Sequence, residues 1–234
     1  MSNERAGLNE FTLENRFVLE HLAGSGGMGD VYKALDRERG IPVAIKVMRD
    51  GMSDDVTRFM REAHILSELN HPYIVHHVAH GLTDTGAPWL AMEWLEGEDL
   101  SERLSRGRLS LQEAIDFGIC LATGLGFAHA HGISHRDLKP SNIFLVGKQL
   151  TDIRILDFGI ARIQMGTHIT RTGALIGTPA YMSPEQARGE SSIDARTDVY
   201  SLGCLLFECL TGTRVFSGTH IAAMLAKILF EEAP

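Results

Sequence analysis

The stretch that decides the fold is His135-Arg136-Asp137-Leu138-Lys139-Pro140-Ser141-Asn142, followed further along the chain by Asp157-Phe158-Gly159. Pro140 has no backbone N–H and disfavours helical backbone at Lys139, so the first motif is predicted to be an ordered loop. Two motifs rich in carboxylate, amide and ammonium groups therefore lie on either side of an apolar segment.

The apolar segment between the motifs predicts a β-hairpin. Residues 143–146 and 153–156 form two short apolar runs, with turn residues between them. If the strands pair antiparallel, the start of the first lies beside the end of the second, which brings Asn142 close to Asp157. Amide and carboxylate oxygens suit a hard cation such as Mg²⁺.

A carboxylate and an ammonium group lie a few residues upstream of this predicted cation site, at Asp137 and Lys139. Groups of this kind beside a bound cation suit phosphoryl transfer, in which catalysis is mostly positioning and charge stabilisation. The alternative is a solvated polar loop beside a hairpin. An eight-residue motif followed at hairpin spacing by a second motif disfavours that alternative.

The two motifs resemble the catalytic loop and the metal-binding motif of protein kinases. The resemblance implies that Asp137 is the catalytic base, that Lys139 contacts the transferred phosphate, and that Asn142 and Asp157 bind Mg²⁺. It also implies an α+β, bilobal fold with a leader at 1–16, a β-rich N-lobe at 17–95 and a mainly helical C-lobe at 96–234, incomplete after the helix around Val199–Leu210.

Length and composition exclude several other classes of protein. The 234 residues can bury a sizeable core, and the net charge of −8 argues against a nucleic-acid-binding surface. The N-terminus has no apolar signal-peptide core, and no apolar run is long and uninterrupted enough to span a bilayer, so a cytoplasmic location is expected. Cys120, Cys204 and Cys209 lie in apolar helical patterns and are expected to be buried free thiols.

Strand patterns dominate the first part of the chain. Residues 17–22, 31–35, 43–48, 73–78 and 89–94 are predicted strands. A glycine-rich loop follows the first of them, and on its own it could indicate a dinucleotide-binding fold or merely a flexible turn. The strand pattern after it favours a hairpin flap over phosphates, because the dinucleotide fold requires a helix at that position.

A lysine and a glutamate are predicted to pair in this half of the chain. Lys46 shares a strand face with Ala44 and Met48, and Glu62 lies on the apolar stripe of the following helix. A carboxylate on a buried face is costly unless it is paired, and Lys46 is its obvious partner. The kinase resemblance gives this pair the role of aligning the α- and β-phosphates of ATP.

The resemblance implies a set of ATP-binding residues in both lobes. Ala23 departs from the family, which usually has a larger aliphatic residue before the first glycine and over the adenine. Met92 matches the gatekeeper position. The implied ATP-binding set is Ala23, Gly24, Ser25, Gly26, Gly27, Met28, Gly29, Val31, Ala44, Lys46, Glu62, Met92, Glu93, Leu95, Asp99 and Phe144.

The C-terminal half contributes helix-capping signals and a candidate regulatory segment. Ser110 with Glu113 predicts a capping box, and the resemblance makes Asp198 a buried acceptor for the backbone at residues 135 and 136. Thr170 and Thr172 lie in a threonine-rich segment and are candidate autophosphorylation sites, which a second copy of the chain could modify in a homodimer.

The function predicted from the resemblance is transfer of the ATP γ-phosphate to Ser or Thr hydroxyls of proteins. Lys139 and the run Gly177-Thr178-Pro179-Ala180-Tyr181 resemble serine/threonine kinases, and the glycine loop resembles the eukaryotic-type kinases of bacteria. Two alternatives remain: a nucleotide-binding scaffold without catalysis, and a small-molecule phosphotransferase. Nucleotide binding without phosphate transfer would favour the scaffold.

Overall fold

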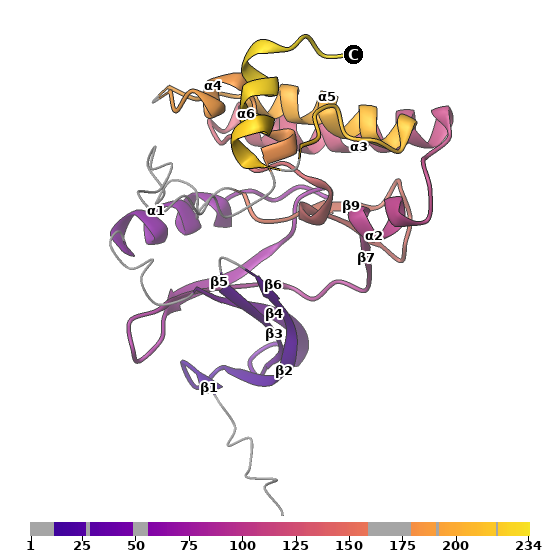
Figure 1. Cartoon of the computed structure of the whole chain (residues 1–234). Coiled ribbons are helices and arrows are strands. Elements are labelled where there is room, and N and C mark those ends of the chain that lie inside the picture. The colour runs from indigo at the N-terminus through magenta and orange to yellow at the C-terminus, as the bar shows by residue number, and fades with distance from the viewer. Residues whose placement is uncertain (1–11, 27–28, 49–55, 159–178, 191, 219) are drawn as a thin grey trace, which may run out of the picture. The chain divides into compact units, whose positions relative to one another are not determined.

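The structure is a computed structural model that describes residues 12–26, 29–48, 56–158, 179–190, 192–218 and 220–234, with the side chains of residues 58, 61 and 62 excepted. The chain divides into two compact units. Unit 1 comprises residues 1–67 and 76–94, and unit 2 comprises residues 68–75 and 95–234 (Figure 1). Each unit is described by itself.

The described part of unit 1 is an antiparallel six-stranded sheet with one helix. The sheet order is β1-β2-β3-β4-β6-β5, and α1 spans Val56–Ser67. The strands are β1 (Thr12–Leu13), β2 (Phe17–Gly26), β3 (Gly29–Asp36), β4 (Ile41–Met48), β5 (His77–Leu82) and β6 (Pro88–Glu93). β1 lies within residues 1–16, the segment predicted to be a leader. Its Leu13 side chain is part of the apolar core.

Alternation along β4 separates two faces of this sheet. One face carries Val43 and Ile45 into a buried cluster with Phe17 and Trp89, whose rings meet edge to face at 5.5 Å. The other face carries Ala44, Lys46 and Met48, as the period of two predicts. The register of this strand is therefore strongly specified, since a one-residue slip would place Lys46 in the apolar core.

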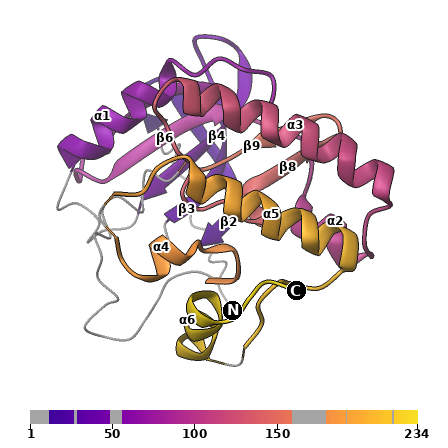
Figure 2. The ribbon, with the colours of Figure 1, turned by 90° about the horizontal axis from the view of Figure 1, so that it is seen from above.

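Unit 2 is mainly helical and contains a small sheet in the order β7-β8-β9. Figure 2 shows its two long helices, α3 and α5, running side by side. They approach closely at Gly118, where a Cβ would lie 3.2 Å from the Leu206 Cδ2 atom. The described elements are β7 (Gly97–Asp99), α2 (Leu100–Ser105), α3 (Leu111–Ala130), η2 (Pro140–Asn142), β8 (Ile143–Val146), β9 (Ile153–Ile155), η3 (Pro179–Tyr181), α4 (Pro184–Ala187), α5 (Arg196–Thr211) and α6 (Ile221–Phe230).

The helix ends in unit 2 follow local sequence signals. The predicted capping box at the start of α3 is present: the Ser110 side chain accepts from the Glu113 amide, and the Glu113 side chain accepts from the Ser110 amide. The α5 helix ends at Gly212, whose φ of 75° is the left-handed conformation that favours glycine. All three cysteines are free and buried, as predicted.

Residues 68–75 belong to unit 2 although unit 1 flanks them in the sequence. Ile74 forms a parallel bridge with Ile155, and the Ile155 amide donates to the Tyr73 carbonyl at 2.8 Å. The prediction of a strand over 73–78 is therefore wrong for its first four residues, since β5 begins only at His77. In this segment the backbone of Tyr73 and Val75 forms hydrogen bonds with Ile155 of β9 instead.

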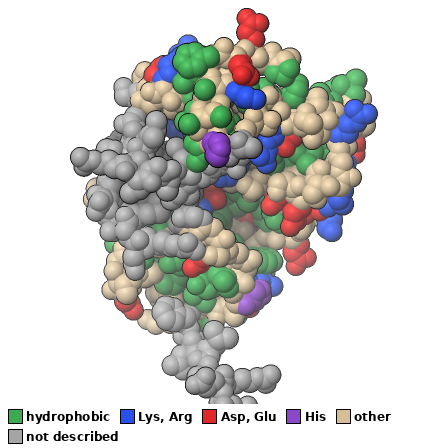
Figure 3. All heavy atoms as spheres, in the orientation of Figure 1, with side chains coloured by type: hydrophobic (Ala, Val, Ile, Leu, Met, Phe, Trp, Pro, Cys, Tyr) green, Lys and Arg blue, Asp and Glu red, His purple; other side chains and the backbone are tan. Residues whose placement is uncertain are grey.

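No helix among the described residues has both the length and the apolar character needed to cross a bilayer. On the face drawn in Figure 3, acidic and basic side chains of unit 2 are interspersed.

Candidate functional site

The loop from His135 to Asn142 connects α3 to β8 and is held by one buried carboxylate. Asp198, near the start of α5, is fully buried. Its Oδ2 atom accepts from the His135 amide at 2.7 Å, and its Oδ1 atom accepts from the Arg136 amide at 2.8 Å. This confirms the predicted role of Asp198, and it supports the left-handed backbone at Arg136, where φ is 63°.

The imidazole of His135 ties the loop to the end of β9. The Asp137 amide donates to His135 Nδ1 at 3.2 Å, so Nδ1 carries no proton. The other ring nitrogen, Nε2, then carries the hydrogen and donates to the Leu156 carbonyl at 2.8 Å. The ring is therefore held as one neutral tautomer. It links the backbone of Asp137 to the backbone of Leu156, the residue before Asp157.

Three polar side chains meet just after this histidine. Lys139 Nζ donates to Asp137 Oδ2 at 2.8 Å. Asn142 Nδ2 donates to the Asp137 carbonyl at 2.8 Å and lies 3.3 Å from Asp137 Oδ2. Asp137 and Lys139 are both largely buried. The carboxylate is therefore held in one orientation by an ammonium group and an amide.

The hairpin that follows brings the second motif to the same end of the small sheet. β8 and β9 pair antiparallel, with Ile143 opposite Ile155, and the Leu156 amide donates to the Asn142 carbonyl at 2.8 Å. The predicted hairpin is confirmed. Asp157 comes next in the chain, with a left-handed φ of 52° that turns the backbone away from the strand direction.

The small sheet also aligns two residues of the predicted ATP-binding set. Asp99 is the register partner of Phe144 in the β7–β8 pair. Asp99 caps α2 as well, accepting from the Glu102 amide at 2.9 Å. Leu95 lies just before β7, and among the described residues its backbone makes no hydrogen bond. Its amide and carbonyl are therefore available to a ligand.

Four other members of the predicted set share one face of the unit 1 sheet. Val31 is opposite Lys46 in the β3–β4 pair, and Ala44 is opposite Met92 in the β4–β6 pair. This is the face opposite the apolar core, and Lys46 is only 7% exposed on it. Glu93 follows Met92, and its side chain accepts from the His76 amide at 2.8 Å.

The described residues of the glycine-rich loop lie at the paired ends of β2 and β3. Gly24 is opposite Val31, and Gly26 is opposite Gly29. Ser25 Oγ donates to Asp30 Oδ1 at 2.6 Å and braces the two strands across the hairpin. Ala23, which precedes Gly24 in β2, is exposed. The structure confirms a strand after the glycines, which excludes the dinucleotide-binding alternative.

Several predicted residues lie outside the described part of the chain. These are Gly27 and Met28 of the glycine loop and the candidate phosphorylation sites Thr170 and Thr172. Glu62 is part of α1, but its side chain is outside the described set, so its pairing with Lys46 stays a prediction.

Two supporting side chains were not found by sequence reasoning. His129 Nε2 lies 2.7 Å from Asp198 Oδ2, and Gln186 Nε2 donates to the Arg136 carbonyl at 2.7 Å. Gln186 also completes a capping box with Ser183, and the Ser-x-x-Gln spacing could have identified that part of its role. No local pattern indicates its contact with Arg136.

Fold and loop geometry together define a protein kinase domain, and comparison with known sequences shows the same. The sequence profile of the family described as "Protein kinase domain" matches residues 17–232. The chain belongs to this family.

Bacterial relatives share much of the sequence. The serine/threonine-protein kinase PknB of Mycobacterium leprae is 42% identical over 214 residues, which cover 88% of this chain and 34% of that protein. A probable serine/threonine-protein kinase of Streptomyces coelicolor is 40% identical over 234 residues, covering 94% and 34% respectively. The chain thus spans about a third of the length of these relatives.

Solved structures show the same fold. A crystal structure of Rad53 in complex with AMP-PNP has a TM-score of 0.75 at 30% identity and covers 92% of this chain and 53% of that one. The kinase domain of PknI from Mycobacterium tuberculosis has a TM-score of 0.74 at 25% identity and covers 97% and 82% respectively.

Proposed function

We propose that this chain transfers the γ-phosphate of ATP to Ser or Thr hydroxyls of proteins. The observation that carries the proposal is the arrangement of Asp137, whose Oδ2 atom is 2.8 Å from Lys139 Nζ and 3.3 Å from Asn142 Nδ2. A carboxylate fixed in this way can accept a hydrogen bond from an incoming hydroxyl and take its proton as the oxygen attacks.

Lys139 complements this base. Its ammonium group is a compact cation that neutralises Asp137 in the resting site and can stabilise the negative charge of a transferred phosphoryl group. Because the pair is held on a loop anchored by Asp198, the two groups stay in place without substrate. This fixed orientation reduces the reorganisation needed when charge develops during transfer.

The chemistry of Asn142 fits a magnesium ligand. Its amide nitrogen is directed at Asp137, which leaves Oδ1 without a hydrogen bond within the described residues. Asp157 supplies a carboxylate just beyond the paired strands, and Mg²⁺ characteristically takes one or two protein oxygens together with phosphate oxygens and water. Among the described residues there is no group of three or more His, Cys, Asp or Glu side chains that could hold a metal ion. Bound Mg²⁺ would neutralise part of the negative charge of the phosphates.

ATP is the proposed nucleotide, and the AMP-PNP in the Rad53 structure supports this choice. The face of the unit 1 sheet with Val31, Ala44 and Met92 offers apolar contacts for adenine, and Lys46 on the same face offers a cation for phosphate. Leu95 supplies an unengaged backbone amide and carbonyl. The full proposed set is that given by the sequence, including Glu62 as partner of Lys46.

Protein Ser or Thr hydroxyls are the proposed acceptors, and Thr170 and Thr172 are proposed as sites that a second copy of the chain phosphorylates. The names of the bacterial relatives support this acceptor class. Location in the cytoplasm is part of the same proposal, since ATP and protein substrates are both present there.

The proposal is tested by phosphate transfer from γ-labelled ATP to a generic basic protein. Asp137→Ala should abolish turnover, and the unfolding midpoint should show whether its fold is retained. Asp152→Ala is the matched control, because the Asp152 side chain is 46% exposed and pairs with Arg154 at 2.6 Å, and it should retain activity. Transfer by the Asp137 variant at the rate of the unmodified chain would refute the assigned role.

A further inference from the structure

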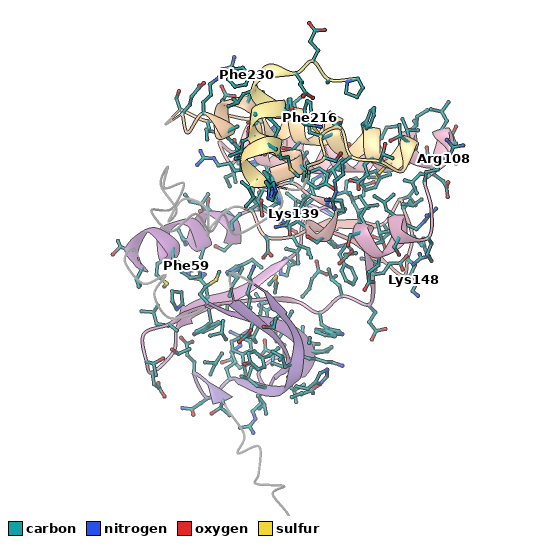
Figure 4. All side chains as sticks on the ribbon, in the orientation of Figure 1. Phe59, Arg108, Lys139, Lys148, Phe216 and Phe230 are labelled. Atoms are coloured by element: carbon teal, nitrogen blue, oxygen red, sulfur yellow. The ribbon has the colours of Figure 1, made fainter. Side chains whose placement is uncertain are left out.

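A pocket in unit 2 lies next to the proposed catalytic base. It has a volume of about 340 Å³, and Lys139, Ser141, Tyr181, Glu208 and Arg214 are among its lining residues. Lys139, labelled in Figure 4, lines the pocket and contacts Asp137 at 2.8 Å, so the pocket begins at the proposed site of transfer. This volume is enough for a side chain of a bound peptide.

Glu208, the one carboxylate among the described residues that line this pocket, is already engaged. Tyr181 donates its hydroxyl hydrogen to Glu208 Oε2, and Arg214 Nε lies 3.7 Å from Glu208 Oε1. Burial, followed by the hydrogen bond to Glu208, raises the pKa of Tyr181, so the tyrosine stays a donor. A cationic ligand would have to compete with both partners for this carboxylate.

Arg214, in contrast, has hydrogen-bonding capacity left. Its contact with Glu208 is longer than a hydrogen bond, and the guanidinium also interacts with the side chain of Tyr181, which leaves further N–H donors among its five. The side chain is 46% exposed. A guanidinium offers five N–H donors in a planar fork that matches a carboxylate or a phosphate.

The exposure of the charged groups favours an anionic ligand. Lys139 and Arg214 each belong to an ion pair in which the cation is the more exposed partner: the Lys139 side chain is 24% exposed against 13% for Asp137, and that of Arg214 is 46% exposed against 14% for Glu208. The hydroxyls of Ser101 and Ser141, also in the lining, can donate to an anion. A cationic side chain would meet these more exposed cations, whereas an anionic one would meet complementary charge.

We propose that this pocket binds an anionic side chain of the acceptor peptide, a carboxylate or a phosphorylated residue, with Arg214 as the residue that determines specificity. The inference rests on the proposed kinase function and names the substrate class of that site. An extended peptide advances about 3.3 Å per residue, so the anionic residue is expected within about three positions of the acceptor.

The test uses one peptide series with a single acceptor serine. Each position within three residues of the acceptor carries Glu, phosphoserine, Gln or Arg in turn, and kcat/KM is measured with the full chain. At one position the Glu or phosphoserine peptide should exceed the Gln peptide by on the order of fivefold, and the Arg peptide should be poorest. Preference for Glu without phosphoserine, or the reverse, distinguishes the two sources of the anion. Equal values for all four residues at every position would overturn the proposal.

Variants of Arg214 identify the residue responsible. Arg214→Glu should reverse the ratio of kcat/KM between the Glu and Arg peptides, and Arg214→Ala should bring the ratio of Glu to Gln close to one. Arg188→Ala is the matched control, because Arg188 is 55% exposed, pairs with Glu190 at 3.3 Å and lies outside the pocket. An unchanged preference in Arg214→Ala, or an equal loss in Arg188→Ala, would refute the assignment.

Peptide binding separates this inference from the proposed function. Fluorescence anisotropy of the labelled Glu and Gln peptides needs no phosphate transfer. Tighter binding of the Glu peptide that depends on Arg214 supports the pocket even if transfer is absent, in which case the kinase function alone fails. Equal binding of the two peptides rejects the pocket.

Discussion

The carboxylate of Asp198 accepts a hydrogen bond from the backbone amide of His135 at 2.7 Å, although the two residues are 63 positions apart. Its other oxygen holds the amide of Arg136 at 2.8 Å. One buried side chain thus sets the backbone of the loop that presents Asp137. Asp198, in α5, therefore fixes the backbone conformation of a loop that lies far from it in the sequence.

Asp198→Ala should strongly destabilise unit 2. The substitution leaves two buried amides and the His129 ring without their acceptor, and each buried unsatisfied donor costs about 1–3 kcal/mol. A loss of at least about 3 kcal/mol in the free energy of unfolding is expected by urea titration. Asp194→Ala, at an exposed pair with Arg196, should cost below about 1 kcal/mol. Equal losses in the two variants would contradict this account.

Gly29→Ala should destabilise the unit 1 sheet. A Cβ at this position would lie 2.2 Å from the carbonyl oxygen of Val47 on the neighbouring strand, so β3 and β4 would have to move apart. Overpacking of this kind costs about 1–3 kcal/mol.

The same substitution at Gly24 provides the matched control for Gly29→Ala. A Cβ at Gly24 would have no atom of the described residues within 4 Å, so Gly24→Ala should stay within about 0.5 kcal/mol of the unmodified chain. The free energies of unfolding of both variants are compared by urea titration. A tolerated Gly29→Ala would show that the strands are not packed as described.

The stability of unit 1 should fall in mild acid because of His77. Burial lowers the pKa of this ring to about 4, and repulsion from His80 and His76 adds to the shift. An unfolded histidine has a pKa of about 6.5, so the unfolded state takes up the proton first. The stabilising contribution is complete above about pH 6.5 and is lost as the pH falls towards 4, by at most about 1.4 kcal/mol per pH unit.

His77→Gln tests this pH dependence while keeping a possible partner for His80, which lies 3.0 Å from His77 Nε2. The variant should show a shallower decline of unfolding free energy between pH 7 and 4. His21→Gln, at an exposed position, should follow the unmodified chain. The same slope in both variants would exclude His77 as the source.

The buried thiols should be unreactive in the native protein. Burial raises the pKa of Cys204 to about 11 and that of Cys209 to about 12, so almost no thiolate is present at pH 8. Iodoacetamide should label the native chain slowly and should label three cysteines in urea. Rapid labelling of Cys204 or Cys209 before unfolding would show that α5 opens readily.

Local sequence patterns predict much of the fold and of the loop. The hairpin of β8 and β9, the capping box before α3 and the glycine that ends α5 each depend on neighbouring residues, and each is confirmed. The face of β4 that carries Lys46 follows from strand alternation alone. These signals needed no knowledge of the tertiary structure.

Several long-range partners were not predicted from the sequence. The contact between Gln186 and the Arg136 carbonyl joins residues 50 positions apart, and His129 meets Asp198 across 69 positions. The bidentate pair of Arg16 with the buried Asp36 also has no local signature. Such pairs depend on which elements pack together, which periodicity does not determine.

Because residues 68–75 belong to unit 2, unit 2 cannot be expressed as one continuous C-terminal fragment without losing part of its contacts. A fragment beginning at Leu95 would lack Tyr73 and Ile74, which supply an extra strand-like partner to Ile155. Its β9 would expose an unpaired backbone edge, which promotes self-association. A separately expressed C-terminal half would therefore have to regain that short peptide, in cis through a redesigned linker or added in trans, before it could serve as a monomeric reagent.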